Sequence, residues 1–433
     1  MTSFFSRKKW NRVFLYLLFI CSTFSIAGTD ASITMLFLIT FLHWLWDRRL
    51  SQLKNPLLWA ILFFMASAVF SGLVNAYETE HLMALRTNWR LLLPILLAVI
   101  LNDVAEDQLL WVFFVFVMLI AIYGIIQYFT GVDWLRPDDQ NFTTPYFSGT
   151  SLEISVFHGK GNFTHHLTYG GFLLLCFPLL VSLIFCNDWN AFSRLSALAI
   201  AILVLLAIGS SLGRSIWLGT AMTGTILFFR LFPKATMAII IIVLAGGTYL
   251  YTQFGKPSFE IQTPTNRIEV IQKRFISGLN LKSNQDRLLM WETGIAAIKD
   301  HFWLGIGYNN DSVVMPAYRK IAIERTGHRF QNNAGTGVHN IYLQTWLNYG
   351  LIGFLGYLSI ILIFLAQSIR TLFRTTRFSF ENSIVWGSIA GVCGFMVAGF
   401  FENNFRDGEV QAMLLILMGL SLSQRQKLND RIF

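Results

Sequence analysis

Apolar residues in this chain form long uninterrupted runs, and polar residues collect between them. Many runs approach the roughly 17 to 25 residues that a helix needs to cross a bilayer. They lack the alternation of apolar and polar positions that marks barrel strands. Because backbone groups inside a bilayer must satisfy their own hydrogen bonds, the pattern predicts an all-α polytopic membrane protein. We expect about 12 transmembrane helices, at Val13–Ala27, Ser32–Trp46, Leu57–Val74, Leu91–Leu101, Leu109–Thr130, Thr168–Cys186, Leu195–Ser210, Ser215–Phe232, Ala235–Tyr251, Ile341–Leu365, Ile384–Phe400 and Val410–Leu422.

One polar stretch, residues 252–338, is far longer than the others and is predicted to form one long loop. Two prolines suggest an irregular connection over residues 256–272. Ser283 and Asp286 have the spacing of a capping box, and apolar positions follow at helical spacing. We therefore expect an amphipathic helix from about Asn284 to Asp300, and a mobile glycine-rich segment over residues 326–338.

Composition and charge support this class and orient it. The chain has 433 residues, 54% hydrophobic and 13% charged, whereas soluble domains carry about 25% charged residues. Lys and Arg lie in alternate short connections, which predicts that both termini are cytoplasmic and that loops 131–166 and 252–338 face outside. The first apolar segment lacks a small-residue cleavage site and is expected to stay as an anchor.

The remaining composition excludes several classes. The net charge of +9 follows from the topology and a basic outer loop, so no nucleic-acid partner is indicated. The four cysteines lie in or at the ends of apolar segments, and no CxxC pair occurs, so neither a disulfide framework nor a zinc site is predicted.

Three arginines on the predicted outer side are candidates for binding an anion. Arg214 lies in a tight Gly-Arg-Ser connection, Arg287 in the first turn of the expected helix, and Arg90 at the outer entrance to a short apolar segment. Charge near bilayer depth is costly unless paired, and a helix start favours anions. The alternative is that these arginines snorkel or pair with nearby carboxylates.

A histidine, His339, comes directly before the apolar segment Ile341–Leu365. An imidazole suits acid–base chemistry near neutral pH. A lone histidine at a helix start more often caps the helix or lies at the interface, so the local sequence leaves both roles open.

Several motifs together resemble the O-antigen ligase and polymerase superfamily. His339-Asn340, nine residues, and then Gly350-Leu351-Ile352-Gly353 is similar to the HN-x9-GxxG signature of that family. The Gly213-Arg214-Ser215 turn, Arg287 opening an Arg-x3-Trp helix, and the long outer loop also resemble it. The segment Gly161–Tyr169, which contains His165, His166 and Tyr169, is similar to the lead into the family core. The resemblance covers roughly residues 160–365.

The resemblance implies a glycosyltransferase of the membrane-embedded C type in a bacterial inner membrane. The donor would be a glycan on undecaprenyl diphosphate at the periplasmic face, and the acceptor a hydroxyl of the lipid A–core oligosaccharide. Arg214 and Arg287, with Arg90 behind them, would hold the diphosphate, and His339 would be the general base of an inverting reaction. Asn340, His165, His166 and Tyr169 would support the site. No Asp-x-Asp motif appears in an outer loop, so neither a metal nor a cofactor is expected.

This interpretation divides the chain into three parts, with helices and a first periplasmic loop in residues 1–160, a ligase-like core in residues 161–365, and further helices in residues 366–433. Three alternatives remain, namely a polymerase extending the lipid-linked glycan, a protein O-oligosaccharyltransferase, and a transporter of lipid-linked glycan. The choice of ligase over polymerase rests on His339-Asn340. A twelve-helix transporter should show repeated halves, and none is evident.

Overall fold

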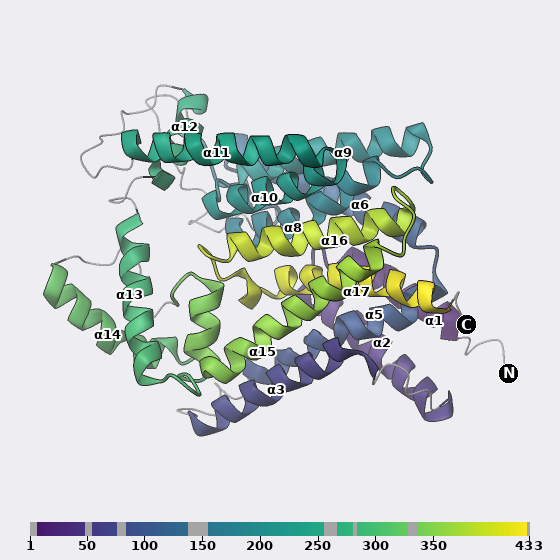
Figure 1. Ribbon diagram of the computed structural model, residues 1–433, viewed down its shortest axis with the longest axis horizontal. Coiled ribbons are helices and arrows are strands. Elements are labelled where there is room, and N and C mark those ends of the chain that lie inside the picture. Colours follow the sequence, from purple (N-terminus) through teal and green to yellow (C-terminus); the bar gives the residue numbers. More distant parts are fainter. Residues whose placement is uncertain are drawn as a thin grey trace.

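The computed structural model describes residues 7–47, 54–75, 84–136, 155–254, 266–279, 284–327 and 337–430. Helices make up most of these ranges, and no strand is found within them. Figure 1 shows most of the helices packed roughly side by side in one bundle, with α13 and α14 projecting beyond one end of it. The predicted all-α class is confirmed.

In chain order, the helices fall into three groups. The first half of the bundle contains α1 (Arg7–Cys21), α2 (Ile26–Asp47), α3 (Pro56–Val74), η2 (Ala84–Leu92), α5 (Leu93–Ile100), η3 (Leu101–Asp103) and α6 (Glu106–Thr130). The middle contains α8 (His166–Ile184), α9 (Ala191–Ser210), α10 (Arg214–Leu231), α11 (Pro233–Phe254), α12 (Arg267–Leu279), α13 (Gln285–Asp300) and α14 (Asp311–Thr326). The last part contains α15 (Ile341–Leu372), α16 (Phe380–Ala398), η5 (Asn404–Arg406) and α17 (Gly408–Asp430).

Within the described residues, six helices are long and apolar enough to cross a membrane: α3, α6, α8, α9, α15 and α16. The chain is therefore consistent with a polytopic membrane protein, and the count of about twelve stays a prediction. Each predicted segment falls at least partly on a helix, but some boundaries are wrong. The first helix ends at Cys21 and not at Ala27, because the hydroxyls of Ser22 and Thr23 donate back to the carbonyls of Phe19 and Ile20.

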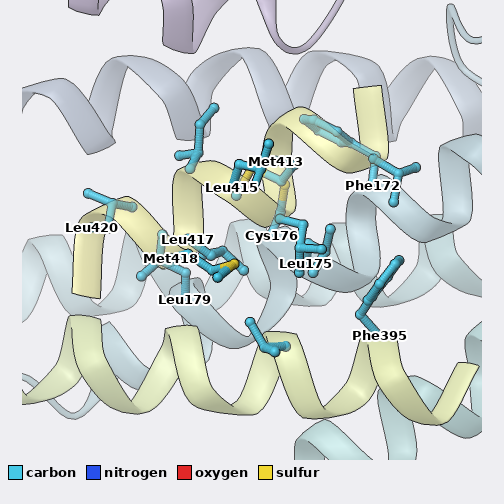
Figure 2. Packing of buried hydrophobic residues seen from close by; sticks show 14 of the residues in the cluster. Phe172, Leu175, Cys176, Leu179, Phe395, Met413, Leu415, Leu417, Met418 and Leu420 are labelled. Atoms are coloured by element: carbon cyan, nitrogen blue, oxygen red, sulfur yellow. The ribbon is translucent and has the colours of Figure 1, made fainter. Parts of the chain in front are cut away.

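Helix α17 forms the centre of the bundle. Every residue from 410 to 424 is buried, as expected for a helix covered on all sides. Figure 2 shows Met413, Leu415 and Leu417 of α17 beside Leu175 and Cys176 of α8. Glycines bring other helices close, since a Cβ on Gly219 of α10 would lie only 2.6 Å from the carbonyl oxygen of Gly394 on α16. Such close backbone approach is typical of helix pairs in membranes.

A break in the helical backbone of α15 holds residues 302–306, which follow α13, against the bundle. Gly350 has φ +68° inside α15, and a Cβ there would lie 2.1 Å from the carbonyl oxygen of Trp303. The chain after α13 enters this break, where the N–H of Ile306 donates to Leu347 (2.7 Å) and that of Leu351 donates to Phe302 (2.8 Å). Glycine is required because other residues strain at this φ. The break thereby fixes α13 beside the start of α15.

The outer segment is more helical than the sequence predicts. The expected helix near Asn284–Asp300 is confirmed as α13. The expectation of irregular chain through Gln272 is wrong from Arg267 onward, because the amphipathic helix α12 begins there and buries Val270. Helix α14 was not predicted, and most of the glycine-rich segment 326–338 lies outside the described residues.

Candidate functional site

Arg287 lies on the face of α13 that turns toward the loop after α16. Arg287 and Trp291 are four residues apart and so share one helix face. Both contact Phe401, the guanidinium carbon at 5.9 Å from the ring centre and the indole at 5.9 Å between ring centres. The Arg-x3-Trp spacing therefore docks α13 onto residue 401 and presents Arg287 to the next residue, Glu402.

Glu402 connects Arg287 to His339. Its Oε1 accepts a hydrogen bond from Nη2 of Arg287 at 3.0 Å, and its Oε2 lies 3.4 Å from Nδ1 of His339. The Glu402 side chain is 8% exposed, whereas that of His339 is 38% exposed. An ionised carboxylate only accepts, so this contact places the proton of a neutral imidazole on Nδ1. Nε2, the other ring nitrogen, is then the basic one.

Asn340 fixes the position of His339 at the start of α15. The Oδ1 of Asn340 accepts from the N–H groups of Tyr342 (2.9 Å) and Leu343 (3.0 Å), and its Nδ2 donates to Phe400 (3.0 Å). These bonds cap α15 and tie it to the loop that carries Glu402. His339 itself has φ +48°. The residue that caps α15 is Asn340 and not His339, so the alternative role of His339 as a helix cap is wrong.

Arg214 lies next to the start of α13. Its guanidinium donates to Oγ of Ser277 on α12 and to Oδ1 of Asn284, both at 3.2 Å. Asn284 is the residue before α13, three positions from Arg287. Arg274 of α12 donates to the carbonyl of Leu212 at 3.1 Å, beside the turn that bears Arg214. The two predicted arginines thus approach the same end of α13, joined by a third that the sequence did not single out.

A group of histidines borders this site. The rings of His158 and His166 are 3.9 Å apart between centres, and both Nδ1 atoms face the carbonyl of Ser211, at 3.3 and 2.7 Å. Burial lowers the pKa of His158 to about 4, although the bond to Ser211 raises it. Burial also lowers the pKa of His165, against the opposing effect of Glu402. Burial therefore favours the uncharged form of both imidazoles, and the positive charge of Arg274 adds to this effect at His158.

The pKa of Arg287 depends on both its burial and its charged neighbours. Burial lowers the pKa of Arg287, Glu402 raises it, and the nearby Arg274 lowers it again. A guanidinium remains charged through such shifts. The site therefore holds several cations around one buried carboxylate, an arrangement that favours an added anion.

An apolar groove of about 880 Å³ opens beside these arginines. Its walls come from α8, α9 and α10, with Trp217 and Leu205 among them, and from Ile271 and Phe275 of α12. The polar residues at one end of α12, Arg274 and Ser277, belong to the arginine cluster. A long hydrocarbon ligand with an anionic head fits this juxtaposition.

A known protein family matches the middle of the chain. Residues 199–358 match the family described as O-antigen ligase. Residues 199–358 are a domain of the O-antigen ligase family. The matched range includes Arg214, Arg287 and His339, and the family indicates a glycosyltransferase-type enzyme. No curated protein matches the chain.

Two other predicted site residues, Tyr169 and Arg90, make their contacts away from Arg287 and His339. Tyr169 is fully buried, its hydroxyl lies 3.3 Å from the carbonyls of Ile120 and Ala121, and its ring packs against Gly124 and Gly161. Its contacts are those of a packing residue. Arg90 forms a two-pronged ion pair with Asp30 on α2, at 2.6 and 2.5 Å, and lines a second cavity.

Sequence reasoning missed Glu402 and Arg274. Glu402 lies after α16, outside the matched part of the ligase family. The available signal was a carboxylate at the outer end of an apolar segment, followed by two asparagines. Arg274 lies just beyond the irregular connection predicted for residues 256–272, where the sequence predicts no helix, whereas the structure places it on α12.

Proposed function

We propose that this chain transfers a glycan from undecaprenyl diphosphate to a hydroxyl of lipid A–core at the periplasmic face. The observation that carries the proposal is the contact chain Arg287–Glu402–His339, with Arg214 at the start of the same helix. It puts a candidate base and candidate diphosphate ligands together within a domain of the O-antigen ligase family.

The proposed reaction is a single inverting displacement at the anomeric carbon. His339 Nε2 takes the proton of the attacking acceptor hydroxyl, and the oxygen forms a bond to that carbon. The bond from the carbon to the diphosphate oxygen breaks, and the diphosphate leaves with the electron pair. Arg214 and Arg287 meet the charge that develops on the leaving group, where fixed cations are most effective, and guanidinium forks match phosphate oxygens.

Glu402 is proposed to be a positioning residue in this reaction. Its Oε2 holds Nδ1–H of His339 and thus directs Nε2 outward, while Oε1 holds Arg287. The polyprenyl chain of the donor is proposed to occupy the apolar groove next to Arg214. In this arrangement the lipid and the diphosphate are bound by adjoining surfaces of α10 and α12.

The polymerase is the second candidate, because it would use the same donor and the same arginines. The two are distinguished by replacing His339 with Ala in cells. For a ligase, long glycan chains should accumulate on undecaprenyl diphosphate while lipid A–core stays bare, since polymer still forms before the blocked step. For a polymerase, single repeat units should accumulate and lipid A–core should carry one unit.

The purified His339→Ala protein should bind the lipid-linked donor normally and lose transfer by roughly 10²- to 10⁴-fold, the usual contribution of a general base. His301 follows the last residue of α13, at the opposite end from Arg287, and His301→Ala serves as the matched control that should retain transfer. Full transfer by His339→Ala at normal expression would contradict the assignment of the base. Normal lipopolysaccharide and normal glycan length in cells that lack this chain would contradict both candidate functions.

A further inference from the structure

A second, polar cavity lies on the other side of the loop that bears Glu402. It has a volume of about 310 Å³, at the lower end of the range of about 300–1,000 Å³ for small-molecule sites. Its walls come from η2, from the segment between α13 and α14, from the first turns of α15, and from residues 403–411. We call it the amide chamber.

The loop after α16 separates the amide chamber from the candidate catalytic site. Glu402 contacts Arg287 and His339, whereas the next residues, Asn403, Phe405 and Arg406, line the chamber. Helix α15 is shared in the same way, because it begins after His339 and lines the chamber with Thr345 and Asn348. A ligand in the chamber would therefore lie one loop away from the base.

The lining has the chemistry of a sugar site. Side-chain amides are numerous in it, and Tyr308 and Tyr349 lie parallel there with ring centres 6.0 Å apart. Amides can donate to and accept from hydroxyl groups, and aromatic rings offer apolar faces with a polar edge. These two features together complement a sugar ring, which has hydroxyls at its edge and C–H groups on its faces.

The charges in the chamber are already paired. Arg90 is bonded to Asp30, and Arg406 lies 3.8 Å from Asp311 and contacts Asn309. A strongly anionic ligand would have to compete with these carboxylates. The lining therefore favours an uncharged ligand.

Two amides in the chamber are left for a ligand. Nδ2 of Asn88 is buried and has no hydrogen-bond partner among the described residues. Asn403 is half-buried, lines the chamber and makes no side-chain capping bond to η5, whereas its neighbour Asn404 donates to Leu167. A buried donor without a partner is costly and calls for an explanation such as a bound group.

From these contacts we infer that the amide chamber binds a neutral saccharide unit through Asn88 and Asn403. The inference rests on the proposed function, which supplies two sources of such units, the glycan of the lipid-linked donor and the glycan of the acceptor. The chamber is a binding subsite, and its residues take no part in proton transfer.

The experiment measures saccharide binding without turnover. Core oligosaccharide and O-glycan, each freed of lipid by mild acid, are added separately to the purified full chain in detergent, and saturation-transfer NMR gives the dissociation constants. Asn88→Ala and Asn403→Ala should each weaken binding of one of the two probes by about threefold to tenfold, as expected for losing one hydrogen bond. Asn102→Ala, an exposed asparagine in η3, is the matched control and should bind like the wild type.

The outcomes separate this inference from the proposed function. Weaker binding of core oligosaccharide alone assigns the chamber to the acceptor, and weaker binding of O-glycan alone assigns it to the donor. Unchanged binding in both variants, or no binding of either probe to the wild type, overturns the inference. Because no transfer is needed, a chain that binds saccharide but fails to transfer glycan would contradict only the proposed function.

Discussion

The carboxylate of Glu402 is nearly buried between a guanidinium and an imidazole, at 3.0 and 3.4 Å. Its two oxygens are used by different partners, so it holds both in one geometry. Local sequence could predict that Arg287 and His339 carry chemistry, because their residue types and helix-start positions are visible in it. It could not predict their connection, because Glu402 is distant from both along the chain and reaches them through the packing of residue 401 on α13.

Replacing Glu402 by Gln should lower kcat by about tenfold to a hundredfold, less than loss of the base itself, because the amide no longer fixes the imidazole by charge. Donor binding should change little, and Glu402→Asp should recover part of the rate. Transfer kinetics with varied donor and acceptor measure this. Glu292 also pairs with an arginine, Arg325 at 2.5 Å, but on an exposed surface, so Glu292→Gln is the control. A rise in KM with unchanged kcat would contradict the positioning role.

Arg214→Ala and Arg287→Ala should each reduce transfer by about 10²-fold or more, the scale of losing one group that stabilises developing charge. Lys at either position should restore only part, since an ammonium cannot form the two parallel bonds of a guanidinium. The exposed Arg325→Ala is the matched control. Transfer should persist in EDTA, and a loss of activity that a divalent ion restores would point to a metal instead of these arginines.

At the scale of elements, the break in α15 shows where sequence patterns stop being informative. Helix α13 was predictable because its cap and its apolar spacing are local. The break at Gly350 depends on residues 302–307, which enter it and bond to both sides. The Gly350 position was visible only as part of a motif, and its physical reason is a backbone contact with a segment about 45 residues earlier.

Gly350→Ala should destabilise the protein and reduce transfer together, because an added Cβ would lie 2.1 Å from the carbonyl oxygen of Trp303 at an unfavourable φ of +68°. The measurements are the thermal midpoint in detergent and the transfer rate of the same sample. Gly246 of α11 has no atom within 4 Å of an added Cβ, so Gly246→Ala should be neutral or slightly stabilising. A Gly350→Ala protein with the wild-type midpoint would exclude the proposed role of the break.

The segment before α8 should make folding sensitive to acid. Its His158 has a pKa of about 4 in the folded chain because of burial, against about 6.5 when unfolded. The unfolded state therefore binds more protons between these values, and stability falls as pH decreases from about 6.5 to about 4. His158→Gln should lower the thermal midpoint at pH 7.5 but flatten its fall toward pH 4.5. An equally steep fall in both proteins would assign the acid sensitivity to other groups.

At the scale of the whole molecule, the contacts divide the bundle into two ends. Arg7 lies 3.7 Å from Asp103, Lys427 lies 2.9 Å from Glu106, and Arg374 donates to Asn429 at 3.4 Å. The start of α1, the start of α6, the connection after α15 and the end of α17 thus share one end. Figure 1 shows α13 and α14 at the other. The basic residues predicted to be cytoplasmic include several at the first end, such as Arg370 and Arg425.

This arrangement predicts that Lys299 on α13 faces the periplasm and Thr376, after α15, faces the cytoplasm. Both positions are exposed. Cys21 and Cys393 are partly accessible, so they are first replaced by Ser, while Cys176 and Cys186 are buried. In intact spheroplasts a membrane-impermeant maleimide should label a Lys299→Cys protein and should label a Thr376→Cys protein only after permeabilisation, because α15 crosses the bilayer between them. The opposite labelling would place His339 and Glu402 on the cytoplasmic side, where a donor presented at the periplasmic face could not reach them.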